Sequence, residues 1–161
     1  MINMATDICS SECNIIDSDI PKSIELTVDA IRSNLNEVQS FIKNYLDKFS
    51  ISHDKISKIL LSSEEIFINI CNYAYSKSIG RMTVSCCLSK NKDIFILRMI
   101  DNGKEFNPLE VSAPNNILNI SDENDLKIGG LGIYLMKKSM DDFQYCYRNG
   151  SNILTMEKRI I

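Results

Sequence analysis

The chain has 161 residues and a formal net charge of −3, with a sequence pI near 5.2. This length predicts one domain with one hydrophobic core, and 44% hydrophobic with 24% charged residues is typical of a globular protein that folds in water. The acidic balance argues against direct nucleic-acid binding, because phosphate contacts need a basic surface. No apolar run approaches the roughly 20 residues of a membrane span. The first residues lack a signal-peptide pattern, so we expect a cytoplasmic location.

The first half of the chain predicts a tail, a strand and two helices. Apolar residues alternate with polar ones from Ile24 to Val28, which is typical of a strand. Apolar residues at three- and four-residue steps then predict two amphipathic helices. The expected elements are a loosely ordered tail over residues 1–22, a strand from Ser23, a helix over 31–46, a break at 50–52 and a longer helix from His53 to about Ser76.

The second half predicts four strands, one helix and a long irregular segment. Two β-rich runs separated by a polar turn indicate a hairpin, and the Asn-Gly turn near the C-terminus indicates another. The irregular segment has the length of a functional loop or lid. The expected elements are strands over 82–88 and 94–99, a polar turn over 101–108, the lid over about 109–128, a glycine-rich helix start at 129–132 with a helix to about 140, and strands over 143–147 and 153–158.

This order of elements predicts an α/β two-layer sandwich over residues 23–161. Strands that follow one another through hairpins form a mainly antiparallel mixed sheet, and the three helices must then cover one face of it.

A narrow polar strip runs along the second predicted helix. Ser62, Glu65, Asn69 and Asn72 are spaced by three, four and three residues, so their side chains line up, while the rest of this helix is apolar. A carboxylate on such a helix costs several kcal/mol if it stays dry and unpaired. The strip therefore faces either solvent or a polar cavity that holds a ligand.

Two glycine-bearing segments add candidate contacts. Asp101 to Pro108 follows an apolar strand, where a carboxylate can accept hydrogen bonds from an exocyclic amine such as that of adenine. Gly129 to Gly132 precedes a helix, whose exposed N–H groups favour phosphate oxygens. Taken singly, the first segment can be a plain turn and the second a flexible hinge.

Together these segments resemble the N, G1 and G2 boxes of the GHKL ATPase superfamily, and most of all the anti-sigma-factor serine kinases of the RsbW and SpoIIAB type. The resemblance covers roughly residues 23 to 160, with order and spacing intact. The matching sequence segments are Glu65-Ile-Phe-Ile-Asn69-Ile-Cys-Asn-Tyr73-Ala74-Tyr75, Asp101-Asn-Gly103-Lys-Glu-Phe106-Asn107-Pro108, Gly129-Gly-Leu-Gly-Ile133-Tyr-Leu-Met-Lys-Lys138 and the last strand Asn152-Ile-Leu-Thr155-Met-Glu-Lys158.

The resemblance implies a Bergerat-type sandwich that binds ATP and Mg²⁺. In this family pattern Glu65 is the general base and Asn69 holds the magnesium. Asp101 binds the adenine amine with support from Thr155, and Gly103 packs against the base. The other matched positions assigned to ATP binding are Phe106, Gly129, Gly130, Leu131, Gly132 and Ile133.

Two positions depart from the family pattern. Asn72 stands where relatives often carry a basic residue or histidine near the phosphates. The predicted lid contains no arginine, so Lys127, its only basic residue, is the candidate for contact with the γ-phosphate.

The resemblance implies a protein serine/threonine kinase that transfers the γ-phosphate of ATP to a STAS-type anti-anti-sigma protein and also acts as an anti-sigma factor. The alternative is an ATP-binding partner-switch module with little or no kinase activity. A sigma factor is a possible partner, and a homodimer is a possible assembly. A sensor histidine kinase fits less well, because the only histidine, His53, lacks the pattern of a phospho-acceptor helix.

Overall fold

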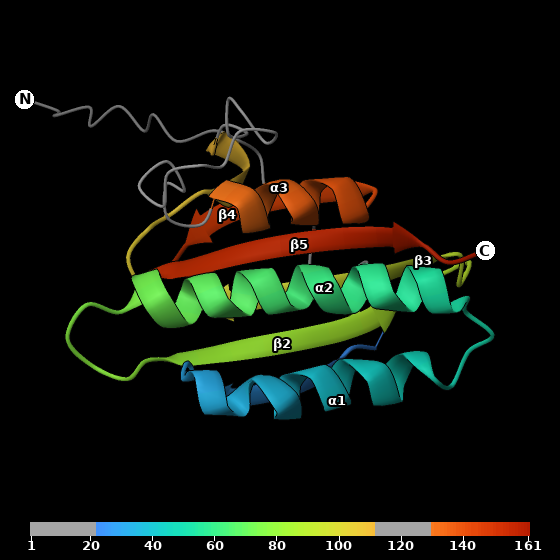
Figure 1. Ribbon diagram of the computed structural model, residues 1–161, viewed down its shortest axis with the longest axis horizontal. Coiled ribbons are helices and arrows are strands. Elements are labelled where there is room, and N and C mark those ends of the chain that lie inside the picture. The colour runs from blue at the N-terminus through green and yellow to red at the C-terminus, as the bar shows by residue number, and fades with distance from the viewer. Residues whose placement is uncertain (1–21, 112–129) are drawn as a thin grey trace, which may run out of the picture.

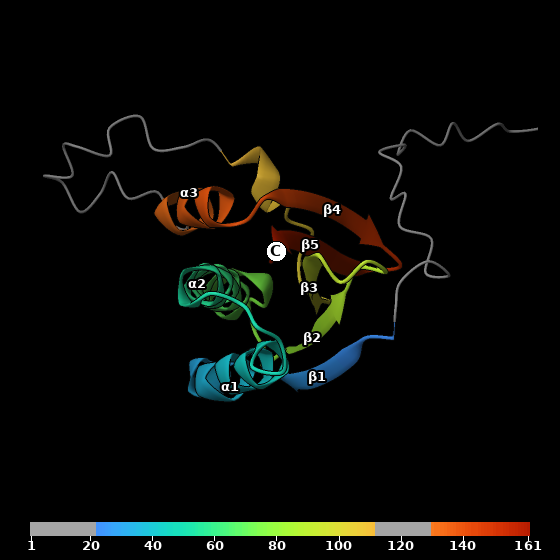
Figure 2. The ribbon, with the colours of Figure 1, turned by 90° about the vertical axis from the view of Figure 1, so that its right-hand side faces the viewer.

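The computed structural model of the chain describes residues 22–111 and 130–161. Within these described residues five strands form one sheet, and three α-helices cover one of its faces (Figures 1 and 2). This confirms the predicted two-layer α/β sandwich. In chain order the elements are β1 (Ile24–Asp29), η2 (Arg32–Asn34), α1 (Leu35–Leu46), α2 (His53–Asn69), η3 (Ile70–Ala74), β2 (Arg81–Leu88), β3 (Ile94–Asp101), η4 (Pro108–Glu110), α3 (Gly130–Ser139), β4 (Asp142–Arg148) and β5 (Ser151–Arg159).

The sheet has the strand order β1-β2-β3-β5-β4, and each of its four neighbouring pairs is antiparallel. The pairing of β3 with β5 places Asp101 opposite Asn152, at the end of the sheet where the candidate site lies. The β4–β5 hairpin turns through Asn149 and Gly150, with φ of 53° and 75°. Positive φ at both central residues is the requirement of a type I′ turn, which an Asn-Gly pair meets at low cost.

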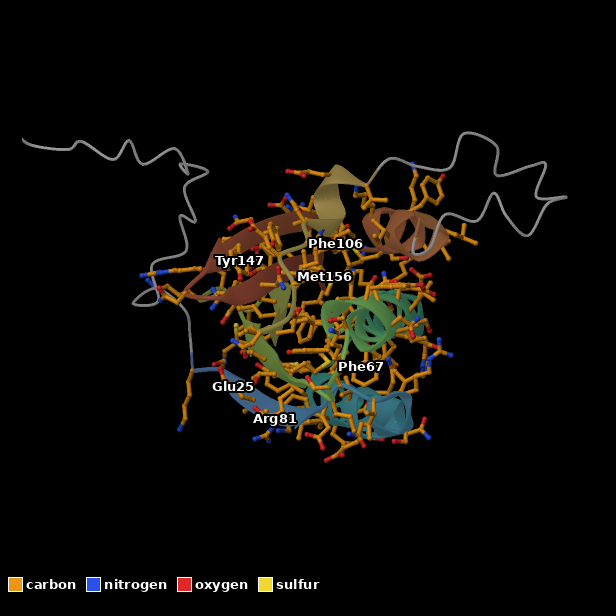
Figure 3. The ribbon with its side chains drawn as sticks, turned by 90° about the vertical axis from the view of Figure 1, so that its left-hand side faces the viewer. Glu25, Phe67, Arg81, Phe106, Tyr147 and Met156 are labelled. Atoms are coloured by element: carbon orange, nitrogen blue, oxygen red, sulfur yellow. The ribbon has the colours of Figure 1, made fainter. Side chains whose placement is uncertain are left out.

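The core lies between the helices and the sheet. Phe67 of α2 and Met156 of β5 are both fully buried and belong to the same hydrophobic cluster (Figure 3). In β3 buried and partly buried side chains alternate along the strand, as the period of two requires, whereas in β5 Thr155 is buried on the opposite face as well. The face that carries Leu97, Met99 and Asp101 is therefore the face that the helices cover.

Helix α2 is shorter than predicted. It begins after Ser52, whose hydroxyl accepts from the Lys55 N–H at 3.5 Å, and it ends at Asn69 rather than near Ser76. The next five residues form the π-helix η3. A π-helix bonds i to i+5, so the side chains after Asn69 turn away from the direction that an α-helix would give them.

Helix α3 begins at Gly130, so Gly130, Leu131 and Gly132 lie in its first turn. The sequence predicts instead that these residues precede the helix. Its Lys137 side chain donates to the carbonyls of Leu109 and Val111, at 2.8 and 3.0 Å. The segment that follows β3 is thereby tied to α3. Most of the predicted lid, and the predicted tail up to residue 21, lie outside the described residues and stay predictions.

Within residues 22–111 and 130–161, no helix has both the length and the apolar character required to cross a lipid bilayer.

We expect Phe67→Ala to lower the free energy of unfolding by about 3 to 5 kcal/mol, because it leaves a cavity in a fully buried site. Urea denaturation followed by circular dichroism measures this. The matched control is Leu61→Ala on the same helix, where 37% of the side chain is exposed. It should cost less than about 1 kcal/mol. Equal losses would contradict the packing described here.

Candidate functional site

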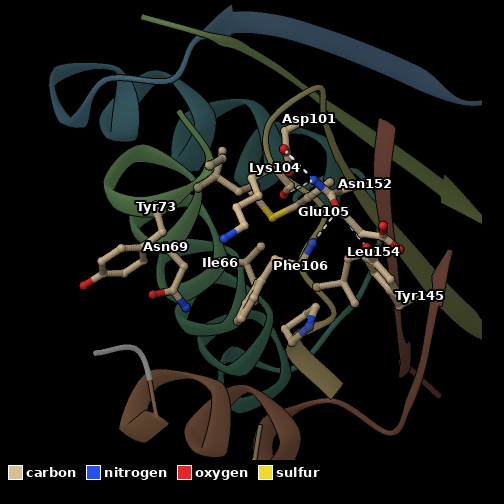
Figure 4. Close-up of a pocket in the computed structure, with 14 residues that line it drawn as sticks. Ile66, Asn69, Tyr73, Asp101, Lys104, Glu105, Phe106, Tyr145, Asn152 and Leu154 are labelled. Atoms are coloured by element: carbon tan, nitrogen blue, oxygen red, sulfur yellow. Dashed lines mark hydrogen bonds between the residues drawn. The ribbon is translucent and has the colours of Figure 1, made fainter. Parts of the chain in front are cut away.

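A cavity of about 260 Å³ opens between the end of α2 with η3 on one side and the ends of β3, β5 and β4 on the other (Figure 4). Three of the predicted site residues line it: Asn69, Asp101 and Phe106. The chain therefore brings Asn69 of its polar helix strip and the start of its Asp-Asn-Gly segment to one place. The lining residues are Ile66, Asn69, Ile70, Tyr73, Ala74, Met99, Asp101, Lys104, Glu105, Phe106, Pro108, Tyr145, Asn152 and Leu154.

Asp101 is the buried acid of this cavity, with only 5% of its surface exposed. It is the last residue of β3 and not the first residue of a turn. Its Oδ1 accepts from the Gly103 N–H at 2.8 Å and from Asn152 Nδ2 at 3.0 Å. Oδ2 has no partner among the described residues, so it remains available to a ligand. Burial raises the pKa of Asp101, and the two hydrogen bonds oppose that shift.

Asn152, and not the predicted Thr155, is the β5 side chain beside Asp101. Thr155 pairs with Arg98 in the sheet, and the alternation of β5 places its side chain on the face away from the helices. Asn152 Nδ2 donates to Asp101 Oδ1 and to the Lys104 carbonyl, both at 3.0 Å. Its Oδ1 accepts from the Phe106 N–H at 3.0 Å and from the Tyr145 hydroxyl at 2.7 Å. The expected support for Asp101 thus comes from another residue of the same strand (Figure 4).

Sequence reasoning missed Asn152 and Tyr145. Both lie in strands of mixed polarity, and Ile153 and Leu154 are apolar residues on opposite faces of β5, so the sequence does not tell which face meets the cavity. Only the register with Asp101 does. Tyr145 is embedded in the site, where burial first and the charge of Glu105 second raise its pKa to about 12. Its hydroxyl is therefore a hydrogen-bond donor at neutral pH.

Gly103 approaches the protein backbone and does not line the cavity. A Cβ on Gly103 would overlap the carbonyl oxygen and Cβ of Ala74, in η3. Next to it, the Lys104 N–H donates to the same Ala74 carbonyl at 2.9 Å. The Tyr75 hydroxyl also holds this loop, since it accepts from the Asn102 N–H at 2.9 Å and donates to the Arg81 carbonyl at 2.5 Å. Glycine is thus required here for loop packing, and the predicted contact with a base stays a prediction.

Glu65 lies one helical turn before Asn69 on α2, beside the first turn of α3. A Cβ on Gly132 would overlap the Glu65 carboxylate, so this glycine makes room for the acid. Glu65 is half-buried and does not line the cavity. Burial, followed by the charge of Glu64, raises the pKa of its carboxyl group. A carboxylate with a raised pKa is a stronger base than a fully solvated one.

Asn69 carries a buried amide nitrogen, Nδ2, that has no hydrogen-bond partner in the described part of the chain. Such an atom costs free energy unless a bound group satisfies it. No cluster of three or more His, Cys, Asp or Glu side chains that could hold a metal occurs within the described ranges. Mg²⁺ needs few protein ligands when phosphates and waters complete its shell, and an amide oxygen is one such ligand. Asn69 therefore fits a magnesium–phosphate group.

The other predicted residues lie elsewhere or are not described. The exposed Asn72 is turned by the π-helix toward Arg32, whose Nε and Nη2 donate to its Oδ1 at 3.3 and 3.0 Å. Gly130 and Ile133 are buried, Leu131 is half-buried, and none of the three lines the cavity. Lys127 and Gly129 lie outside the described residues.

Comparison with known proteins identifies relatives over most of this structure. The family described as histidine kinase-like ATPase domain matches residues 28–158. Curated relatives named serine-protein kinase RsbW include one from Bacillus thuringiensis, 24% identical over 142 residues, which span 83% of this chain and 82% of that protein. Another, from Bacillus mycoides, is 22% identical over 134 residues, with the same coverage of both chains.

Two solved structures share the fold. The crystal structure of the RsbU and RsbW domains of a Mycobacterium tuberculosis protein superposes with a TM-score of 0.60 and 15% identity, over 87% of this chain and 33% of that one. The histidine kinase domain of a blue-light activated histidine kinase from Erythrobacter litoralis gives a TM-score of 0.52 and 14% identity, over 80% of this chain and 60% of that one. The chain thus corresponds to part of each of these larger proteins.

We expect Asp101→Asn to raise the free energy of unfolding at pH 7. The raised folded-state pKa of Asp101 means that the ionised carboxylate destabilises the fold at neutral pH. This penalty fades as the pH falls through the raised pKa and is absent below the unfolded-state value, so the advantage of Asp101→Asn should vanish in acid. Urea denaturation at a series of pH values measures it.

The exposed Asp142→Asn serves as the control for this pH series. It should change stability by less than about 0.5 kcal/mol at each pH. A stability difference between Asp101→Asn and the parent chain that grows toward low pH would have the wrong sign for a buried carboxylate.

Proposed function

Because the chain belongs to the histidine kinase-like ATPase domain family, we propose that it is an ATP-dependent protein serine/threonine kinase with anti-sigma activity, whose substrate is a STAS-type anti-anti-sigma protein. The observation that carries this proposal is the meeting of Asn69 and Asp101 in one cavity, with Glu65 one helical turn away. Curated relatives named serine-protein kinase over 82% of their length support the same class.

Asp101 is proposed to bind the base of the nucleotide. Asp101 lines a largely apolar cavity that includes Ile66, Met99 and Leu154, and its Oδ2 has no partner among the described residues, which suits a flat ring with one amine at its edge. Phe106 adds an aromatic side chain, 51% exposed, at the same cavity. A buried acceptor among apolar walls favours adenine, whose exocyclic amine is a donor.

The phosphates are proposed to lie on the α3 side of Asn69, near Glu65 and Gly132. Asn69 would hold the magnesium, which supplies charge neutralisation for the phosphates when it is bound. Glu65 would accept the proton of the attacking hydroxyl group, for which its raised pKa suits it. Lys104 is the one cation among the described residues that line the cavity, whereas Lys137 is bonded to backbone carbonyls.

Asp101→Asn should weaken Mg-ATP binding at least tenfold, because an amide nitrogen that takes the place of the carboxylate oxygen is a donor and cannot accept from the amine of the base. Isothermal titration calorimetry measures the affinity, and the pH series above shows that the variant is folded. The control Asp142→Asn should bind as the parent chain does. Equal, tight binding by Asp101→Asn would remove Asp101 from the nucleotide site.

Glu65→Gln should retain Mg-ATP binding but lower phosphoryl transfer to a STAS-domain partner by roughly 100-fold or more, the scale of a positioned acid–base group. Transfer of ³²P from labelled ATP in single-turnover mixtures measures this. The control is Glu37→Gln, the same change at an exposed residue of α1, with an expected effect below about threefold.

Full transfer by Glu65→Gln would exclude Glu65 as the base. If the parent chain binds Mg-ATP and the partner but transfers no phosphate, the partner-switch module is the better description. In that case nucleotide-dependent retention of a sigma factor, compared between ATP and ADP, becomes the decisive measurement.

A further inference from the structure

The orientation of the Asn152 amide is fixed by two backbone groups. The Phe106 N–H can only donate, so the atom that it meets at 3.0 Å must be Oδ1 of Asn152. The Lys104 carbonyl can only accept, so the atom at 3.0 Å from it must be Nδ2. The amide cannot be flipped without breaking both contacts. Its second N–H is consequently directed at Asp101 Oδ1.

This arrangement fills one oxygen of Asp101 and leaves the other free. Oδ1 accepts from the Gly103 N–H and from Asn152, which uses both of its lone pairs. A ligand can therefore meet only Oδ2. With Oδ1 occupied by two donors, rotation of the carboxylate would break two hydrogen bonds of Asp101, a residue with only 5% of its surface exposed.

Asn152 itself offers nothing to a ligand. Its amide makes four hydrogen bonds, two as donor and two as acceptor, and the fourth comes from the partly buried Tyr145 hydroxyl at 2.7 Å. Any effect of Asn152 on ligand choice must then pass through Asp101 and through the loop over residues 104–106.

We propose that Asn152 is a positioning residue that determines base selectivity, because it occupies Oδ1 of Asp101 and leaves Oδ2 as the one acceptor for a ligand. The site then selects a purine that carries an amine at the edge facing Asp101, and it rejects a purine that carries a carbonyl there. This inference rests on the proposed function, since it presumes that a nucleotide occupies the cavity.

The test compares ATP with inosine triphosphate, which differs by a carbonyl in place of the amine. The parent chain should bind Mg-ATP at least about tenfold more tightly than the magnesium complex of inosine triphosphate, because the carbonyl would face Oδ2 without a proton between them. Calorimetry gives both dissociation constants, and their ratio is the readout. A uniform loss of structure would weaken both nucleotides and leave the ratio unchanged.

The sharpest variant is Asn152→Asp, which has nearly the same shape. It keeps acceptors for Phe106 and Tyr145 but replaces the donor that faces Asp101 with a carboxylate oxygen. The new carboxylate oxygen lies against Asp101 Oδ1 and repels it, so Asp101 must take up a proton or turn, and in either case it no longer holds Oδ2 as a fixed acceptor. The preference for ATP should fall to within about threefold. Asn152→Ala, which frees Oδ1 without adding charge, should also lower the ratio.

The matched control is Asn102→Asp. It adds the same charge one residue from Asp101, but the Asn102 side chain is exposed and bonded to the Ser151 hydroxyl at 2.8 Å, away from the cavity. Its preference for ATP should remain within about threefold of that of the parent chain. Thermal denaturation of all variants establishes which of them are folded. If Asn152→Asp is not folded, the ratio measured for Asn152→Ala tests the inference in its place.

The outcomes separate the inference from the proposed function. If the parent chain binds neither nucleotide, the proposed function fails and takes the inference with it. If the parent chain prefers ATP and the folded Asn152 variants keep the same ratio, the nucleotide site stands and Asn152 has no part in selectivity. A loss of preference in Asn102→Asp as large as in Asn152→Asp would assign the effect to charge alone and overturn the inference.

Discussion

The hydrogen bond between Asn152 and Asp101 is the interaction on which the site depends. A buried carboxylate is tolerated only if donors reach it, and Asp101 obtains its donors from Asn152 and from the Gly103 backbone. The same amide holds the Lys104 carbonyl and the Phe106 N–H, so one side chain of β5 fixes both the acid and the loop beside it. The β3–β5 register makes this possible by placing the two residues opposite each other.

The π-helix supplies the opposite wall. By ending the α-helix at Asn69, it leaves that amide at the cavity and brings the Ala74 carbonyl to the Lys104 N–H. The close approach requires a residue without a Cβ at Gly103. The helix layer and the sheet layer are thus joined at the site by backbone contacts, which side-chain motion does not loosen. π-Helical turns recur at functional sites for this kind of reason, because the extra residue redirects the side chains that follow.

A second close approach defines the other end of the site. Gly132 lets the first turn of α3 pack directly on Glu65 of α2. The acid is thereby partly removed from water, which is the physical cause of its raised pKa. Both the base-binding end and the phosphate end that we propose rely on a glycine, and in each case the missing side chain accommodates protein rather than ligand.

The sequence alone determined the layers of the fold, because hydrophobic periods of two and of about 3.6 residues distinguish strands from helices. The sequence also identified Glu65, Asn69 and Asp101 as polar residues in apolar surroundings. It could not choose Asn152 over Thr155, because β5 is apolar on both faces and strand register is a long-range property. Nor could it locate the π-turn that directs Asn72 toward Arg32, because that turn depends on the loop that packs against Ala74. Only the tertiary structure decided which polar groups share the cavity, since segments from β3, β4, β5 and α2 meet there.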